Sequence, residues 1–154
     1  ESVTMEGSTF APPPQRFEAG VPMVAQAVGL EAAVRYLDNV GIEWIEQHEH
    51  DLTAYALATL SQMPGVRIIG PESTVDRGSA ISFVVDGLHT HDVGEGLDDR
   101  GVAGRVGHHC AWPTCRRYGV PATTRLSTYL YNDLDDIDAA AAGVRAAQEF
   151  FGVV

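Results

Sequence analysis

Two long stretches near the start of the chain predict consecutive helices. From residue 26 to residue 40, apolar side chains recur every three or four positions, and Gly41 is suited to end a helix there. From about residue 43 to residue 62, apolar and aromatic side chains again share one side. The Met-Pro-Gly sequence at 63–65 stops this second helix, so we expect strands only after it.

Four short apolar runs predict the strands of a sheet. They contain β-branched residues, and glycine, proline or aspartate near their ends favours turns. The predicted strands cover residues 66–69, 80–85, 102–106 and 124–131.

Three further helical segments complete the pattern. Asp92 is a plausible N-cap for a helix that reaches about residue 100, and residues 112–118 form a helical turn. Asn132 or Asp133 caps a final helix whose acidic first turn suits the helix dipole. The apolar face of this last helix consists of Leu134, Ile137, Ala141, Val144, Ala147 and Phe151. This order of elements predicts an α+β fold, in which a small, mostly antiparallel sheet is covered by helices.

The first 26 residues differ from the rest of the chain. Pro12, Pro13 and Pro14 forbid a regular helix or a central strand, so residues 1–26 are expected to form an irregular arm. Residues 27–154 then form the folded domain. The whole chain has 154 residues, 45% of them hydrophobic, which is enough for one domain with a core.

The charged residues exclude several kinds of chemistry. The chain carries 10 Lys+Arg against 21 Asp+Glu, and all of the basic residues are arginines. Without lysine, no side-chain amine can form a Schiff base with a carbonyl substrate or with pyridoxal phosphate, and no Walker-type phosphate loop is possible. The net charge of -11 argues against nucleic acid or an anionic membrane as the main partner, because both reward clustered positive charge.

The sequence also bears on location. The first residues lack a basic start followed by an apolar run, and no apolar stretch approaches the roughly 18 residues of a membrane span. With two cysteines a disulfide framework is not expected, which favours a cytoplasmic, reduced setting. The chain begins without methionine, a hint that it is a fragment or a processed piece.

The stretch from residue 105 to residue 125, RVGHHCAWPTCRRYGVPATTR, carries the candidate chemistry. Cys110 follows a Gly-His-His loop, five residues after Arg105 and fifteen before Arg125. Cationic neighbours favour the thiolate, which is the nucleophilic form of cysteine. A lone cysteine is also often a small buried hydrophobe, so the residues alone leave a functional and a structural role open.

Metal binding is a second interpretation of the same region. No CxxC or HxxxH spacing organises the possible ligands, and two adjacent histidines do not easily face one ion, so a full zinc site is the weaker interpretation. The residues of ligand type are His89, His91, His108, His109, Cys110 and Cys115.

Several segments together resemble a known family. They are RFEAG at residues 16–20, HTHDVGEGLDDRGVAGRVGHHCAWP from residue 89 and TRLSTYLYND from residue 124. With the helix pair between them, they resemble the C-terminal part of SufS-type (group II) cysteine desulfurases of the aminotransferase class V family, over about residues 10–152. The most specific feature is RxGHHCA followed by an arginine fifteen residues after the cysteine.

The resemblance implies a pyridoxal-phosphate enzyme of fold type I. Such an enzyme takes sulfur from L-cysteine, leaves L-alanine and feeds iron–sulfur cluster assembly. By position, Cys110 would attack the sulfur of the cysteine–cofactor adduct and hold it as a persulfide. Arg125 would pair with the substrate carboxylate, for which a planar guanidinium is suited. Arg105 would line the entrance and help to position the Cys110 loop.

The resemblance also implies partners. His91 matches a histidine that, in members served by a SufU-type acceptor, transiently replaces a zinc ligand of that acceptor. A surface position at a helix N-terminus is the equal alternative for His91. The family is dimeric, which predicts a homodimer and a sulfur acceptor of the SufU or SufE type.

The chain departs from the family in two respects. Val21 stands where many relatives have a threonine that contacts the cofactor phosphate of the partner subunit. The family's cofactor lysine, stacking histidine and phosphate loop lie in an N-terminal large domain and have no counterpart here. The chain is therefore expected to comprise an arm from the end of the large domain, residues 1–26, and the small domain, residues 27–154. It is expected to bind no cofactor and to be inactive alone.

An alternative role belongs to a different class of protein. The chain would then be a stand-alone interaction or sulfur-carrier module, and it would dock on a separate large domain or on an acceptor. Its acidic surface would serve recognition in that case.

Overall fold

A computed structural model of the chain describes residues 2–154. It divides into two compact units, Glu1–Gly41 and Ile42–Val154. In the first unit, strands β1 (Ser2–Val3) and β2 (Ser8–Thr9) form an antiparallel pair, followed by a short 3-10 helix, η1 (Gln15–Phe17), and by helix α1 (Val24–Val40). The strands of this arm are two residues long and exposed, so they leave no alternating apolar pattern in the sequence. The expected boundary at residue 26 stays a prediction.

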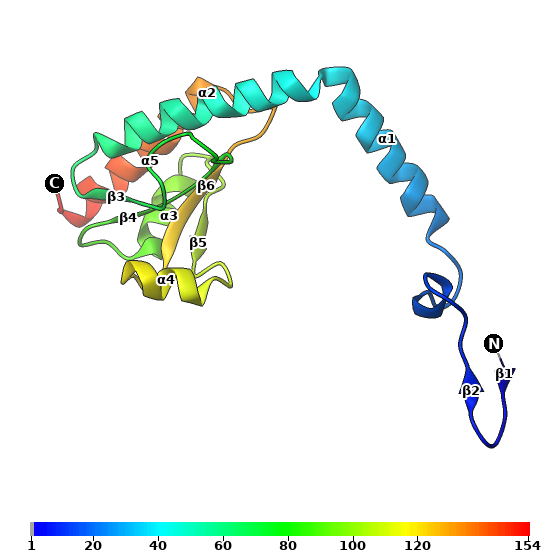
Figure 1. Cartoon of the computed structure of the whole chain (residues 1–154). Coiled ribbons are helices and arrows are strands. Elements are labelled where there is room, and N and C mark those ends of the chain that lie inside the picture. The colour runs from blue at the N-terminus through cyan, green and yellow to red at the C-terminus, as the bar shows by residue number, and fades with distance from the viewer. Residues whose placement is uncertain (1) are drawn as a thin grey trace. The chain divides into compact units, whose positions relative to one another are not determined.

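The second unit has the α+β architecture expected from the sequence (Figure 1). Its strands pair antiparallel throughout, in the order β3-β4-β6-β5. Its elements are α2 (Ile42–Ser61), β3 (Val66–Ile69), β4 (Ala80–Val85), α3 (Thr90–Asp98), β5 (Arg105–Gly107), α4 (Trp112–Tyr118), β6 (Thr123–Ser127) and α5 (Leu134–Phe151).

One face of this sheet forms the core. Side chains alternate along β4, so Ile81 and Phe83 point to the same face, where Leu126 of β6 also lies buried. Helices α2, α3 and α5 pack around these side chains (Figure 1). Burial of this apolar cluster is the main favourable term for folding the unit.

The other face of the sheet carries polar residues in register. Ser82 of β4 lies opposite Arg125 of β6, and Arg125 lies opposite Arg105 of β5. These residues alternate with the core positions, so their side chains point away from the α2, α3 and α5 layer. Ser82, Arg125 and Arg105 thus form a polar row across this face of the sheet.

Three predicted boundaries differ from the structure by three residues or more. Helix α3 begins at Thr90 with His89 as N-cap, so the predicted cap at Asp92 is wrong. The imidazole of His89 accepts a hydrogen bond from the backbone N–H of His91 at 3.3 Å, a capping role in which Ser, Thr, Asp and Asn are the expected residues. The third strand is shorter than predicted, because Val102 N–H bonds back to the carbonyl of Leu97 and extends the turn after α3.

The last boundary involves the loop before α5. Strand β6 ends at Ser127 rather than residue 131, because the Asn132 side chain accepts from Tyr129 N–H at 2.9 Å and forms a turn. Of the two predicted caps, Asp133 is the one used, in a reciprocal capping box with Asp136.

Candidate functional site

The loop that carries Cys110 has an unusual backbone. Gly107 has a φ of 119°, which glycine adopts without a side-chain clash. His109 and Cys110 follow with φ values of 52° and 57°, both in the left-handed region. This turn leaves Cys110 exposed at the end of the loop, directly before α4.

Side chains within the loop stabilise this conformation. The backbone N–H of Cys110 donates to Nδ1 of His108 at 3.0 Å, and the His108 ring stacks on Trp112 with centroids 4.5 Å apart. Nε2 of His109 lies 2.9 Å from the hydroxyl of Thr123 and 3.2 Å from its carbonyl oxygen. A carbonyl oxygen can only accept, so this contact places the ring proton of His109 on Nε2.

The two arginines predicted from the sequence are brought together. Arg105 and Arg125 are direct cross-strand partners. Among residues 2–154, no acidic side chain forms an ion pair with either of them, and Nε of Arg125 is buried without a hydrogen-bond partner. Like charges in this arrangement repel each other, and an anion placed between them relieves the repulsion.

His109 lies within the field of both guanidinium groups. Its pKa is lowered from the ordinary value of 6.5, first because partial burial penalises the charged imidazolium, and further because Arg125, Arg105 and His108 repel a positive charge. The hydrogen bond with Thr123 opposes this shift. The surroundings of His109 therefore disfavour the charged imidazolium.

A hollow of about 250 Å³ separates the polar face of the sheet from α4. Cys115 borders it and is only 4% exposed, so the second cysteine is a buried thiol rather than a surface nucleophile. The hollow is lined by Ile69, Ser82, His108, His109, Ala111, Thr114, Cys115, Thr123 and Arg125.

The residues of metal-ligand type are distributed differently from a zinc site. His89 and His91 pack edge to face at the start of α3, whereas the other four lie in the Cys110 loop and α4. The part of the chain that the structure describes contains no group of three or more His, Cys, Asp and Glu side chains able to hold an ion.

Two other predicted positions belong to other elements of the chain than the Cys110 loop. His91 is exposed in the first turn of α3, with its backbone N–H bound to the His89 ring. Val21 is exposed in the first unit. Within residues 2–154, no helix has both the length and the apolar character that a membrane span requires.

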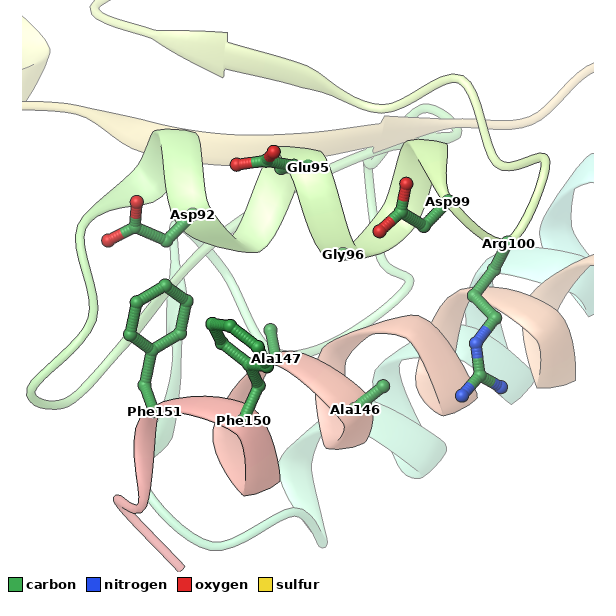
Figure 2. A pocket seen from close by; sticks show the side chains of 9 residues that line it. All are labelled: Asp92, Glu95, Gly96, Asp99, Arg100, Ala146, Ala147, Phe150 and Phe151. Carbon is green, nitrogen blue, oxygen red and sulfur yellow. The ribbon is translucent and has the colours of Figure 1, made fainter.

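A second hollow, of about 280 Å³, was not predicted from the sequence (Figure 2). Figure 2 shows Asp92, Glu95 and Asp99 of the α3 region on one side and Phe150 and Phe151 of α5 on the other. Phe150 is 84% exposed. Phe151, which the sequence places on the apolar face of the last helix, is 46% exposed at the rim of this hollow. None of the predicted site residues lines it.

Comparison with known proteins supports the resemblance seen in the sequence. The chain is 58% identical over 152 residues to a probable cysteine desulfurase of Mycobacterium leprae, covering 99% of this chain and 36% of that protein. It is 55% identical over 152 residues to a probable cysteine desulfurase of Streptomyces coelicolor, with the same coverage. The chain thus spans about a third of the length of the curated relatives it matches.

Solved structures give the same result for the fold. The apo cysteine desulfurase of Thermococcus onnurineus superposes with a TM-score of 0.85 at 35% identity, covering 100% of this chain and 38% of that one. The cysteine desulfurase CsdA of Escherichia coli gives a TM-score of 0.85 at 33% identity, covering 97% and 37%. The expected α+β class and the resemblance to part of a cysteine desulfurase are confirmed. A family model for aminotransferase class-V proteins matches residues 1–140, and the chain therefore belongs to the aminotransferase class-V family.

Proposed function

We propose that this chain is the sulfur-accepting part of a cysteine desulfurase. In this role Cys110 takes the sulfur of L-cysteine and holds it as a persulfide. The observation that carries the proposal is the unpaired Arg105–Arg125 couple beside the loop that exposes Cys110. A cationic pair next to the loop that exposes a thiol suits a small substrate that bears both a carboxylate and a sulfur atom.

Arg125 is the better placed of the two arginines to bind the substrate carboxylate. It lies on the central part of the polar row, between Ser82 and Arg105, and it lines the same hollow as His109. Its partly buried guanidinium loses less hydration on binding an anion than an exposed one would. Arg105 is exposed, which suits a role at the entrance.

The net reaction needs no external oxidant. L-cysteine and the Cys110 thiol give L-alanine and a Cys110 persulfide, with every atom accounted for. The substrate carbon that loses sulfur gains a proton and an electron pair, and the transferred sulfur is oxidised to the persulfide level. The accepting thiol must also be within reach of the substrate. Cys110 is exposed, whereas Cys115 is buried.

The residues of this chain do not fit pyridoxal phosphate by themselves. The sequence contains no lysine to hold the cofactor, and Val21 offers no hydroxyl for its phosphate. Pyridoxal phosphate, held by residues outside this chain, would supply the chemistry that cleaves the carbon–sulfur bond. We therefore expect the 154-residue chain alone to be inactive.

The next acceptor of the sulfur belongs to the same proposal. The exposed position of Cys110 permits transfer to a SufU- or SufE-type acceptor and then to iron–sulfur cluster assembly. His91 is exposed in the first turn of α3, as a transient zinc contact with such an acceptor requires. A homodimer of the full enzyme is proposed on the same family basis.

The test uses the longer enzyme that contains this chain. After incubation with L-cysteine, peptide mass spectrometry is expected to find one added sulfur atom on the Cys110 peptide, together with L-alanine in solution. Cys110→Ser should abolish the added sulfur and leave cofactor absorbance unchanged, whereas Cys115→Ala serves as the matched control and should retain it. Sulfur on Cys115 instead, or none on either cysteine, would overturn the proposal.

A further inference from the structure

The Cys110 loop requires an external restraint. His109 and Cys110 are consecutive non-glycine residues in the left-handed region. This conformation costs backbone free energy for residues with a side chain, so it persists only where surrounding contacts hold it. The contacts that hold it therefore determine where the Cys110 sulfur lies.

Most of the contacts are internal to the loop. The Cys110 N–H binds the His108 ring, the Ala111 N–H binds the His108 carbonyl at 2.7 Å, and His108 stacks on Trp112. These contacts lie within residues 108–112 and would move with the loop as one piece. These contacts determine the shape of the loop. Its position relative to the sheet depends on contacts with residues outside the loop.

The His109 side chain supplies a contact outside the loop. Its Nε2 reaches Thr123, fourteen residues later, at the start of strand β6. Thr123 is only 3% exposed and is held in the sheet by pairing with Gly107. Arg125 lies two residues further along the same strand, so the His109–Thr123 contact ties the Cys110 loop to the strand that carries this arginine.

We propose that His109 is a positioning residue that, through Thr123, keeps Cys110 in register with the Arg105–Arg125 pair and thereby favours carboxylate-bearing sulfur compounds at this thiol. The inference rests on the proposed function in one respect, namely that the arginine pair receives a carboxylate. His109 itself makes no contact with the substrate in this role.

Two alkylating reagents test the proposal on the chain itself. Iodoacetate and iodoacetamide differ in one group, a carboxylate against an amide. The ratio of their rate constants at Cys110, divided by the same ratio for a small free thiol, measures the preference for a carboxylate. Peptide mapping assigns the modification to Cys110 rather than to the buried Cys115.

The expected result is a carboxylate preference in the unmodified chain that depends on His109. His109→Phe keeps an aromatic ring without its nitrogens and should lower the preference about threefold to tenfold, the range that loss of one hydrogen bond gives. His109→Gln retains an N–H near Nε2 and should rescue it. Thr123→Val should lower the preference similarly, and the double variant His109→Phe/Thr123→Val should lower it little further, because both changes remove one contact.

His48→Phe is the matched control. Nε2 of His48 lies 2.9 Å from the Asn132 carbonyl, so this variant also loses a histidine contact to a distant backbone oxygen. It should leave the carboxylate preference unchanged, which separates positioning from general destabilisation. If the unmodified chain shows no preference, the carboxylate role of the arginine pair fails and the role of His109 fails with it. If a preference exists and survives both His109→Phe and Thr123→Val, the role of His109 alone is overturned.

Discussion

Arg105 and Arg125 lie directly opposite each other on neighbouring antiparallel strands, and no acidic side chain described in residues 2–154 forms an ion pair with either. Like charges in this position weaken a sheet. The net charge of the chain is -11, so a carboxylate partner would have been easy to supply from within. The absence of an ion pair at this place agrees with a site that receives its anion from a substrate.

The first prediction concerns the stability cost of this pair. Arg105→Gln should increase the free energy of unfolding by a few tenths to about 1 kcal/mol, because it removes the cross-strand repulsion. The gain should shrink as salt is added, since salt screens exposed charges. Urea unfolding at two salt concentrations measures both effects.

Arg67→Gln provides the control for this measurement. Arg67 is an exposed arginine on β3 that lies opposite Val84 rather than another charge. The variant should not show the same salt-dependent gain. An equal gain in both variants would mean that overall charge, and not the arginine couple, sets the effect.

The second prediction concerns substrate binding in the longer enzyme. Arg125→Gln should raise KM for L-cysteine about tenfold to a hundredfold, because a charge-assisted hydrogen bond to a carboxylate contributes roughly 1.5–3 kcal/mol. Cofactor absorbance should not change. Steady-state kinetics over a range of L-cysteine concentrations checks the prediction, and an unchanged KM would remove Arg125 from substrate binding.

Local sequence patterns predicted most elements of the second unit. Strands β3 and β4 have the predicted bounds, because each is a β-branched run next to a glycine- or proline-containing turn. Helix α4 also has the predicted bounds, with a proline in its first turn and Gly119 at its end. The cap of α3 was missed because an imidazole acceptor at the N-cap is rare, and the sequence rule favoured Asp92 instead.

The geometry of the candidate site could be predicted from the sequence only in part. The local charge pattern singled out Cys110, Arg105 and Arg125, and resemblance to a family gave them roles. The pairing of the two arginines depends instead on strand register. Register follows from contacts between residues far apart in the chain, which no local pattern reveals. The His109–Thr123 contact is hidden for the same reason, since the sequence offers only a histidine without a predicted partner and a threonine just before a predicted strand.

The third prediction separates the two thiols. Cys110 is exposed and should react rapidly with a disulfide reagent in the folded chain. Cys115 is 4% exposed and should react only after unfolding. Absorbance at rising urea concentration should therefore show one fast thiol and a second that appears with the unfolding transition. Two fast thiols in the absence of urea would contradict the packing of α4.

The fourth prediction follows from the lowered pKa of His109. In the folded chain this imidazole binds a proton less readily than in the unfolded chain, where its pKa is near 6.5. The unfolded state therefore takes up more protons as the pH falls below about 6.5, and this contribution to the free energy of unfolding decreases there. Above that pH the contribution is constant.

Comparison of two chains over pH 5 to 8, a range centred near the pKa of histidine, isolates this effect. The difference in unfolding free energy between the unmodified chain and His109→Gln should decrease toward acid pH, because glutamine does not titrate. A difference that grows toward acid pH would show that the folded chain stabilises the imidazolium, contrary to the direction given by burial and the two arginines.

The last prediction concerns the close contact of α3 and α5. A Cβ added to Gly143 of α5 would lie 3.1 Å from the carbonyl oxygen of Gly96 and 3.2 Å from Cα of Leu97. Backbone atoms cannot rotate away as a side chain can, so Gly143→Ala should destabilise the second unit by about 1–3 kcal/mol despite the better helix propensity of alanine. Gly29→Ala in α1 is the matched control, because nothing lies within 4 Å of the added carbon, and it should instead increase helicity by circular dichroism. An increase in stability from Gly143→Ala in urea unfolding would show that the two helices are free to move apart.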